Sequence, residues 1–203
     1  MEKDNTVIIG LTGPTGAGKS TACKAAEKLG FAVIDADRVA REVTEKGSAL
    51  LPILKEAFGN VLNPDGTLCR KKLAAKAFRT PQNTERLNAV MLPAITEKIA
   101  QKIKTLQSNG QRFILLDAPT LFESGADRLC TATMAVLAPK DVRLSRIMAR
   151  DKLTKAAAEL RMSAGKPDRF YLEHCDRIFN NHGTKEALYL AATRFFESFL
   201  LTQ

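Results

Sequence analysis

The residues with the clearest chemical meaning form one short run near the N-terminus, at positions 13–21. Gly13, Gly18, Lys19 and Ser20 match the pattern G-x-x-x-x-G-K-[ST], whose backbone N–H groups surround the oxygens of a phosphate chain. We expect Lys19 to reach the β- and γ-phosphate oxygens and the Ser20 hydroxyl to complete the shell of a magnesium ion. The residues expected to bind the nucleotide are Gly13, Gly16, Ala17, Gly18, Lys19, Ser20 and Thr21.

The flanks of this run supply the context that the pattern requires. Residues 6–11 read as a short buried strand, and residues 20–29 read as a helix. A helix that starts at the loop adds the positive end of its dipole to a phosphate site. The alternative is a glycine-rich turn with a chance lysine, and the order strand, loop, helix counts against it.

Carboxylates follow two of the predicted strands. Asp35 and Asp37 lie at and just after the end of residues 31–35, and Asp117 ends residues 113–117. Ligands of an open parallel sheet bind at the carboxyl ends of its strands. We therefore expect Asp37 to serve a hydroxyl nucleophile and Asp117 to lie on the metal side of the site. The alternative is that such aspartates cap the helix that follows them.

A third candidate group is a set of arginines in the second half of the chain. Arg143, Arg146 and Arg150 recur at i, i+3 and i+7, so on a helix they share one face. Three guanidinium groups on one stripe suit a cluster of phosphate oxygens. The alternative is a basic helix face that only contacts solvent.

The composition limits the class of protein. The chain has 203 residues, 45% of them hydrophobic, which predicts one domain with insertions. The net charge of +9 fits a polyanionic partner, but the absence of Trp and the presence of only two Tyr disfavour a nucleic acid. We expect no membrane association, because no signal peptide and no apolar run of about 18 residues is present. The four cysteines form no C-x-x-C pair, which indicates reduced thiols in a cytoplasmic protein without a zinc site.

Along the whole chain, apolar strands alternate with helical stretches, which predicts an α/β fold with helices around a mostly parallel sheet. Residues 50–107 contain no convincing strand and read as a helical insertion, in which Pro93 is expected to interrupt the helix at residues 83–106. The other predicted helices are residues 39–46, 49–58, 70–79 and 184–200, and the other predicted strands are residues 133–138 and 176–180.

Several segments, taken in order, resemble the dephospho-coenzyme A kinase family over nearly the whole chain. The segments are Ile9-Gly10-Leu11-Thr12-Gly13, Val33-Ile34-Asp35-Ala36-Asp37 with Ala40-Arg41, Phe58-Gly59, Gly66-Thr67-Leu68, Arg70-Lys71-Lys72-Leu73, Leu87-Asn88, Pro93-Ala94-Ile95, Asp117-Ala118-Pro119, Leu121-Phe122-Glu123, Arg146, Arg150-Asp151, Arg161 and Asn181 with Gly183.

The resemblance implies a P-loop NTPase fold of three layers, with a helical substrate-binding insertion at residues 50–107 and an arginine-rich lid at residues 141–175. It also implies transfer of the γ-phosphoryl group of ATP, with Mg²⁺, to the ribose 3′-hydroxyl of dephospho-coenzyme A. Lys19, Asp37 and Arg146 would be catalytic, Arg143 and Arg150 would bind the nucleotide, Ser20 and Asp117 would hold the metal, and Asp35, Arg70, Leu121, Phe122, Glu123 and Arg161 would bind the substrate. The expected assembly is a monomer or a small homo-oligomer.

The chain departs from the family pattern at Cys69, Leu92, Thr120 and Gly165, and none of these positions lies in the phosphate loop. Another kinase of the nucleoside monophosphate type, with a different acceptor, is therefore the nearest alternative. A nucleotide-dependent switch is a more distant one, because the segment closest to N-K-x-D begins with Gly165 and so lacks the asparagine amide that would read a guanine base.

Overall fold

A computed structural model describes residues 6–201 and contains one five-stranded parallel sheet with the strand order β2-β3-β1-β4-β5. The strands are β1 (Val7–Thr12), β2 (Ala32–Asp35), β3 (Phe113–Asp117), β4 (Ala132–Leu137) and β5 (Arg177–Asn180). Every residue of the central strand β1 is buried, as expected for a parallel strand covered on both faces. The predicted α/β class is confirmed.

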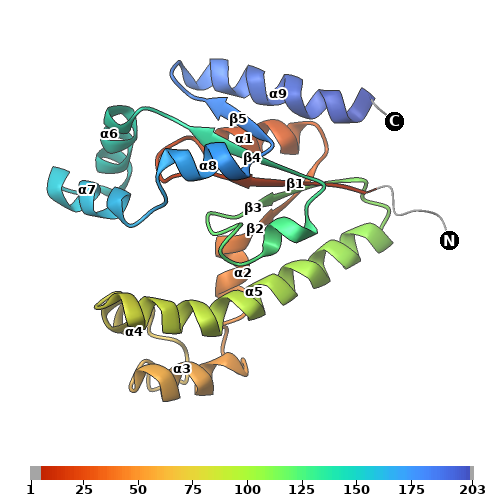
Figure 1. Cartoon of the computed structure of the whole chain (residues 1–203). Helices are drawn as coiled ribbons and strands as arrows, with labels where there is room; N and C mark the ends of the chain where they lie inside the picture. Colours follow the sequence, from red (N-terminus) through yellow and green to blue (C-terminus); the bar gives the residue numbers. More distant parts are fainter. Residues whose placement is uncertain (1–5, 202–203) are drawn as a thin grey trace.

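Helices cover the two faces of the sheet in separate layers (Figure 1). On one face lie α1 (Lys19–Lys28) and α9 (Lys185–Leu201), and on the other lie α2 (Ala36–Glu42) and α5 (Pro81–Ser108). Successive residues of β1 serve different layers, because side chains alternate along a strand. Ile9 packs in the core under α1 and α9, whereas Ile8 packs in the core under α2 and α5.

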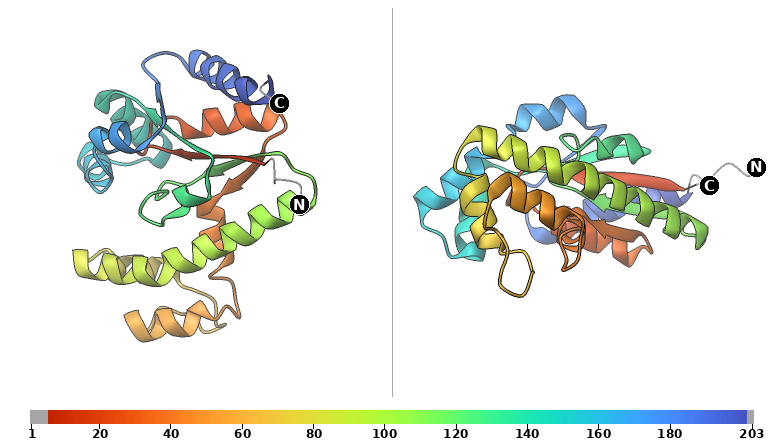
Figure 2. Two further views of the ribbon diagram at one scale, coloured as in Figure 1. Left: turned by 45° about the vertical axis from the view of Figure 1, so that its right-hand side comes forward. Right: turned by 90° about the horizontal axis from the view of Figure 1, so that it is seen from below.

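The segment between α2 and α5 forms a helical extension beside the first part of that long helix (Figure 2). It contains α3 (Leu50–Phe58) and α4 (Arg70–Ala77), which pack against the first half of α5. A small core of its own holds it together, with Leu54, Phe58 and Leu73 at the centre. Among the described residues its β-structure is limited to one isolated antiparallel bridge between Leu62 and Leu68.

Two predictions about these helices are wrong. Helix α5 runs unbroken through Pro93, although proline removes a backbone donor, because packing holds the helix on both sides of it. Met91 packs in the core of the extension, and Ile99 is buried under the sheet. Helix α2 begins at Ala36, three residues earlier than predicted, because the Asp35 carboxylate accepts hydrogen bonds from the first free N–H groups.

The remaining helices follow β4 and extend beyond the carboxyl edge of the sheet. They are α6 (Lys140–Asp151), α7 (Lys155–Ser163) and α8 (Asp168–His174), and a short 3₁₀ turn, η1 (Ala126–Leu129), precedes β4. Helices α6 and α7 pack on each other and project from the body, whereas Tyr171 of α8 packs on β4. Across residues 6–201 no helix is both long enough and apolar enough to cross a membrane.

Candidate active site

The phosphate loop, residues 13–21, connects β1 to α1 and forms one wall of an open cavity of about 630 Å³. Residues that are far apart in the sequence complete this cavity. The lining residues are Thr15, Gly16, Ala17, Gly18, Lys19, Ser20, Asp117, Arg146, Ala149 and Arg150. The structure therefore brings the predicted lysine, the predicted metal-side aspartate and two of the three predicted arginines to one place.

Lys19 is held at the floor of the loop. It is the first residue of α1, and its Nζ donates a hydrogen bond of 3.0 Å to the carbonyl oxygen of Gly13. This bond folds the lysine side chain back over the loop. The ammonium group then lies at the positive end of the α1 dipole, where an anion is stabilised by both.

Helix α6 packs directly on the phosphate loop at Gly16. A Cβ atom at position 16 would lie 2.9 Å from the carbonyl oxygen of Arg143 and 3.2 Å from Cγ1 of the buried Ile147. Gly16 also has a φ of 79°, which side chains rarely adopt. Only glycine permits this approach of the two backbones, so the first half of α6 is packed closely against the loop.

Asp117 ends β3 and faces the cavity with one carboxylate oxygen unused. Its Oδ2 accepts a hydrogen bond from the Cys23 thiol at 3.4 Å, and its Oδ1 is buried without a hydrogen-bond partner among the described residues. Burial raises the pKa of Asp117, and Lys19 opposes that shift. Burial likewise raises the pKa of the Cys23 thiol, which keeps it protonated and able to donate. The free oxygen is a ready ligand for a cation.

Asp35 and Asp37 lie next to Asp117 at the carboxyl edge of the sheet. Asp35 is the residue of β2 that pairs in register with Asp117 of β3. Both exposed aspartates are close enough to raise the pKa of Asp117 through repulsion of like charges. The capping alternative holds for Asp35, whose Oδ1 accepts from the N–H groups of Asp37 and Arg38. Asp37 has no such bond at its carboxylate among the printed contacts of the described residues, so it faces solvent beside the site.

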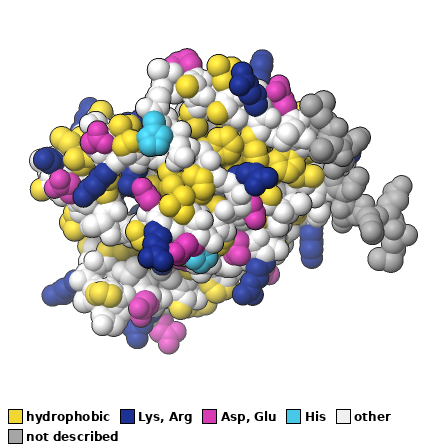
Figure 3. Space-filling view, turned by 45° about the horizontal axis from the view of Figure 1, so that its top comes forward, with side chains coloured by type: hydrophobic (Ala, Val, Ile, Leu, Met, Phe, Trp, Pro, Cys, Tyr) yellow, Lys and Arg dark blue, Asp and Glu magenta, His cyan; other side chains and the backbone are white. Residues whose placement is uncertain are grey.

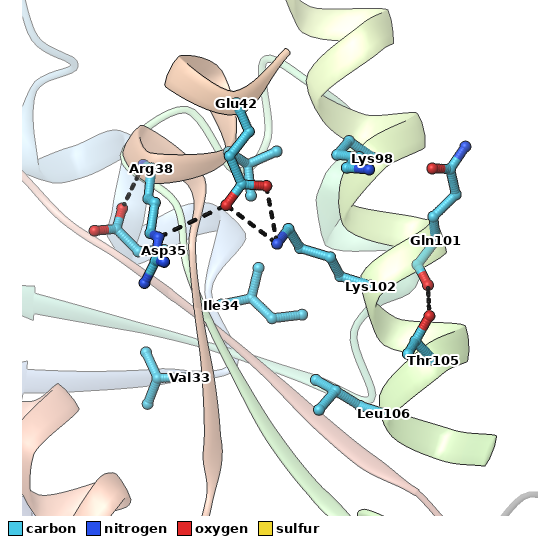
Figure 4. Close-up of a pocket in the computed structure, with 11 residues that line it drawn as sticks. Val33, Ile34, Asp35, Arg38, Glu42, Lys98, Gln101, Lys102, Thr105 and Leu106 are labelled. Carbon is cyan, nitrogen blue, oxygen red and sulfur yellow. Dashed lines mark hydrogen bonds and ion pairs between the residues drawn. The ribbon is translucent and has the colours of Figure 1, made fainter. Parts of the chain in front are cut away.

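A hollow of about 510 Å³ lies between β2, α2 and α5, and its ion pairs hold α2 in place (Figure 4). Lys102 of α5 lies 2.9 Å from Oε2 of Glu42, and Arg38 lies 3.6 Å from Oε1 of the same carboxylate. Partly exposed pairs of this kind contribute little stability singly. Here the pair of Lys102 with Glu42 joins the helix that carries Asp37 to the long helix α5, whereas Arg38 and Glu42 both lie on α2.

The three arginines of α6 have different partners, although they have the predicted spacing. Arg146 Nη1 donates to the carbonyl oxygens of Gly16 and Ala17, at 3.3 Å each. Arg150 lines the same cavity but forms a two-fold hydrogen bond with Asp151, at 2.8 and 2.9 Å. Arg143 turns away and pairs with Asp168 at 3.2 Å. Of the three arginines on the predicted stripe, only Arg146 and Arg150 therefore line the cavity.

The other side chains expected at the substrate are spread over the rim. Arg70 at the start of α4 donates to Oγ1 of Thr44 at 3.1 Å, which ties the helical extension to the segment after α2. Phe122 packs edge-on against Phe170, and Arg161 of α7 pairs with Asp151 at 2.8 Å.

The two residues that flank Phe122, Leu121 and Glu123, lie in different surroundings. Glu123 lies 4.0 Å from Lys166, which lies between α7 and α8. Leu121 is completely buried beneath Gly10, so it belongs to the core and has no surface with which to touch a ligand. Its expected role as a substrate contact is therefore corrected.

Asn181 and Cys23 are parts of the site that the residue patterns did not assign. Asn181 follows β5, is 3% exposed, and donates from Nδ2 to the carbonyl oxygen of Ala17 at 2.7 Å. Cys23 lies on α1 and bonds to Asp117, as described above. Both contacts join residues that are distant in the sequence, so no local spacing reveals them. Asn181 had two signals in the sequence: its position after a predicted strand and its place among the segments that resemble the family.

Positive charge is not gathered into one patch on the face drawn in Figure 3, where basic and acidic side chains are interspersed. In the cavity, by contrast, three cationic residues, Lys19, Arg146 and Arg150, occur with a single acidic residue, Asp117. A polyanion such as a phosphate chain is the ligand that this arrangement suits.

Comparisons with known proteins agree with this geometry. The family model described as dephospho-CoA kinase matches residues 7–186. A dephospho-CoA kinase of Corynebacterium glutamicum is 37% identical over 193 residues, which cover 95% of this chain and 96% of the relative. The solved structure of TT1252 from Thermus thermophilus superposes with a TM-score of 0.79 at 28% identity, covering 95% and 97% of the two chains. Dephospho-CoA kinase from Campylobacter jejuni has a TM-score of 0.69 at 26% identity, with 96% of each chain covered.

Proposed function

This chain belongs to the dephospho-CoA kinase family, and from that premise we propose how its residues divide the work of the reaction. The reaction transfers the γ-phosphoryl group of ATP to the ribose 3′-hydroxyl of dephospho-coenzyme A. The observation that carries the assignment of roles is the single cavity in which the phosphate loop meets Asp117 and the lid arginines. The phosphate loop and the segments with Asp117, Arg146 and Arg150, which resemble the family in sequence, all contribute residues to this cavity.

The donor occupies the phosphate loop. Backbone N–H groups of residues 13–21 and the ammonium group of Lys19 bind the β- and γ-phosphates, and Arg146 enters from the lid side. In the structure Arg146 rests on the carbonyl oxygens of Gly16 and Ala17, a short distance from where the phosphates bind. It neutralises charge that develops on the transferred group, which is the usual task of such a guanidinium.

The acceptor reaches the site from the side of α2. Asp37 is exposed at the carboxyl edge of the sheet, next to Asp117, and takes or orients the proton of the attacking hydroxyl. Asp35 supports it by capping α2, so that the first turn carrying Asp37 is fixed. Arg70, Phe122, Glu123 and Arg161 remain proposed contacts around the acceptor, and Arg150 remains a proposed contact of the donor. Arg143 pairs with Asp168 outside the cavity, so we do not propose it as a contact of the nucleotide.

Magnesium fits the oxygens that this site offers. The residues Asp117 and Ser20 both line the cavity, Oδ1 of Asp117 has no hydrogen-bond partner among the described residues, and Mg²⁺ prefers one or two oxygen ligands together with substrate phosphates. Within residues 6–201 no cluster of three or more potential metal ligands occurs, which agrees with a metal that arrives with ATP. When bound, the ion neutralises the β- and γ-phosphate oxygens.

Two wider expectations belong to the same proposal. The four cysteines are free thiols, none of them in a disulfide, which supports a cytoplasmic location. We expect a monomer or a small homo-oligomer. The helical insertion, residues 50–107, would bind the acceptor, and residues 141–175 would act as a lid over the donor.

A coupled assay of ADP release tests the proposal. With ATP and Mg²⁺ the purified protein should release ADP when dephospho-coenzyme A is added and not when AMP or another free nucleotide replaces it. Asp37→Asn should lower kcat by about 10²- to 10⁴-fold, because a positioned base contributes that much. Asp35→Asn is the matched control: asparagine caps a helix as well as aspartate does, so its kcat should change little. Activity with a free nucleotide, or full activity of Asp37→Asn, would contradict the assignment.

A further inference from the structure

Asn181 has the most tightly buried polar side chain at the back of the phosphate loop. It follows β5, where its backbone N–H continues the sheet by donating to the carbonyl oxygen of Leu137 at 2.7 Å. Its side chain is 3% exposed, and Nδ2 donates to the carbonyl oxygen of Ala17 at 2.7 Å across 164 positions of the sequence. The far end of the sheet therefore contacts the backbone of the nucleotide-binding loop.

The contact fixes the orientation of one peptide unit. The carbonyl oxygen of Ala17 accepts from Asn181 and, at 3.3 Å, from Arg146. In a planar trans peptide the C=O and the following N–H point in opposite directions. The N–H of Gly18 therefore points away from Asn181. Because Gly18 lines the cavity, we take that N–H to face the phosphates.

Close packing at Gly18 excludes other arrangements of the loop. Gly18 has a φ of 114°, which side chains rarely adopt, and a Cβ atom there would lie 2.7 Å from Nδ2 of Asn181. The side chain of Asn181 thus fills the space directly behind Gly18. A flipped peptide would turn the Ala17 carbonyl oxygen toward the phosphates and would lose both donors.

Asn181 also carries a cost that packing alone would not justify. Its Oδ1 is buried and has no hydrogen-bond partner among the described residues. Leaving a buried acceptor unpaired is unfavourable, and leucine would fill a similar volume without that penalty. The polar residue is therefore explained by the bond that its Nδ2 makes.

We propose that Asn181 is a positioning residue for the donor: it holds the Ala17–Gly18 peptide so that the Gly18 N–H is directed at the phosphate chain. The proposal rests on the proposed function only in that the loop binds a nucleoside triphosphate. It predicts a role in the binding of phosphate groups, separate from the binding of the base or of dephospho-coenzyme A.

Calorimetric titration of Asn181→Leu and Asn181→Asp with ATP, ADP and adenosine tests the proposal, and the exposed neighbour provides the control Asn180→Asp. Each Asn181 variant should raise the Kd of ATP and of ADP by about tenfold, a loss of one buried hydrogen bond. The Kd of adenosine and the KM of dephospho-coenzyme A should stay within about twofold, and Asn180→Asp should resemble the wild type. An unchanged Kd of ATP, or an equal loss for ATP and adenosine, would overturn the proposal.

If the Asn181 variants fail to fold, the proposal can still be tested on the unaltered protein. The amide proton of Gly18 should shift strongly downfield in the NMR spectrum when ADP is added and should not respond to adenosine. No shift with ADP would also overturn the proposal. If the acceptor assay fails while these phosphate-dependent effects appear, the proposed function is wrong and the role of Asn181 stands.

Discussion

The thiol of Cys23 donates a hydrogen bond to Oδ2 of Asp117, 94 positions away in the sequence, over 3.4 Å. Cys23 comes one turn after Lys19 on α1, and Asp117 ends the neighbouring strand β3. The bond occupies one oxygen of the carboxylate and leaves Oδ1 as the free one. The first helix after the phosphate loop thus sets the rotation of the proposed metal ligand.

We expect Cys23→Ala to raise the Mg²⁺ concentration needed for half-maximal activity by a few-fold, because a neutral hydrogen bond is worth about 1 kcal/mol. Cys23→Ser keeps a donor and should restore most of the Mg²⁺ dependence. The KM of dephospho-coenzyme A should stay unchanged in both variants. Activity is measured as a function of the Mg²⁺ concentration at saturating ATP. If the curves of Cys23→Ala and the wild type were equal, the thiol would have no role in holding Asp117 for the metal.

The buried carboxylate of Asp117 should reduce the stability of the protein without ligand. Its folded pKa is raised, chiefly by desolvation, so the ionised form destabilises the fold at neutral pH. The penalty grows as the pH rises through the raised pKa and disappears below the usual aspartate value of about 4. Asp117→Asn should therefore have a higher Tm than the wild type at pH 8 and an equal Tm in acid, while its activity falls. Thermal unfolding over a pH series tests the sign, and a lower Tm for the variant at pH 8 would refute it.

Arg146 and Arg143 should differ in their effect on turnover. Arg146 lines the cavity and contacts the loop, whereas Arg143 pairs with Asp168 outside it. Arg146→Ala should lower kcat by about 10²-fold or more, since it removes a donor aimed at developing charge. Arg143→Ala, the matched control from the same helix, should lower kcat by less than about tenfold. Steady-state kinetics measures kcat for the two variants. A larger loss of kcat in Arg143→Ala than in Arg146→Ala would contradict the assignment.

Asp176 anchors the strand that leads to Asn181. Its Oδ2 accepts from the backbone N–H of Thr133 at 2.7 Å and from the Thr133 hydroxyl at 2.8 Å, and these bonds lower the pKa of Asp176. A lowered pKa contributes stability above the usual aspartate value, and that stability is lost as the pH falls through the folded pKa. We expect Asp176→Ala to lower the free energy of unfolding by about 1 kcal/mol at pH 7 and by less in acid. Urea unfolding at pH 7 and pH 3 measures both values, and a larger loss at pH 3 would contradict the prediction.

The sequence allowed much of the fold and the central part of the site to be predicted, because those features are encoded locally. The phosphate loop is a consecutive run, and Asp117 was expected at the edge of the sheet because it ends an apolar segment. The unbroken α5 could not be predicted, since the packing that keeps Pro93 in a helix comes from two separate cores. The same limit applied to Asn181 and Cys23, whose partners are determined by the topology of the sheet.

The arginines of α6 illustrate the remaining gap between pattern and structure. Their spacing correctly placed them on one helix, but spacing does not say which partner each side chain finds. Asp151, the next residue in the sequence, pairs with Arg150, whereas Asp168 becomes the partner of Arg143 only through the fold of the chain between α6 and α8. The helical period correctly predicted that the three arginines lie on one face of α6. The direction of the guanidinium groups of Arg143 and Arg150 depends on their ion pairs with Asp168 and Asp151.

The contact between Gly16 and α6 has a mechanical consequence. There is no room for even a methyl group between the loop and the backbone of Arg143. Because of this close packing, we expect the first turns of α6 to keep their position relative to the phosphate loop. Between α6 and α7 the backbone takes a left-handed conformation at Lys152, which has a φ of 53°. If residues 141–175 close over the cavity as proposed, we therefore expect the backbone angles to change at this turn and not at the start of α6.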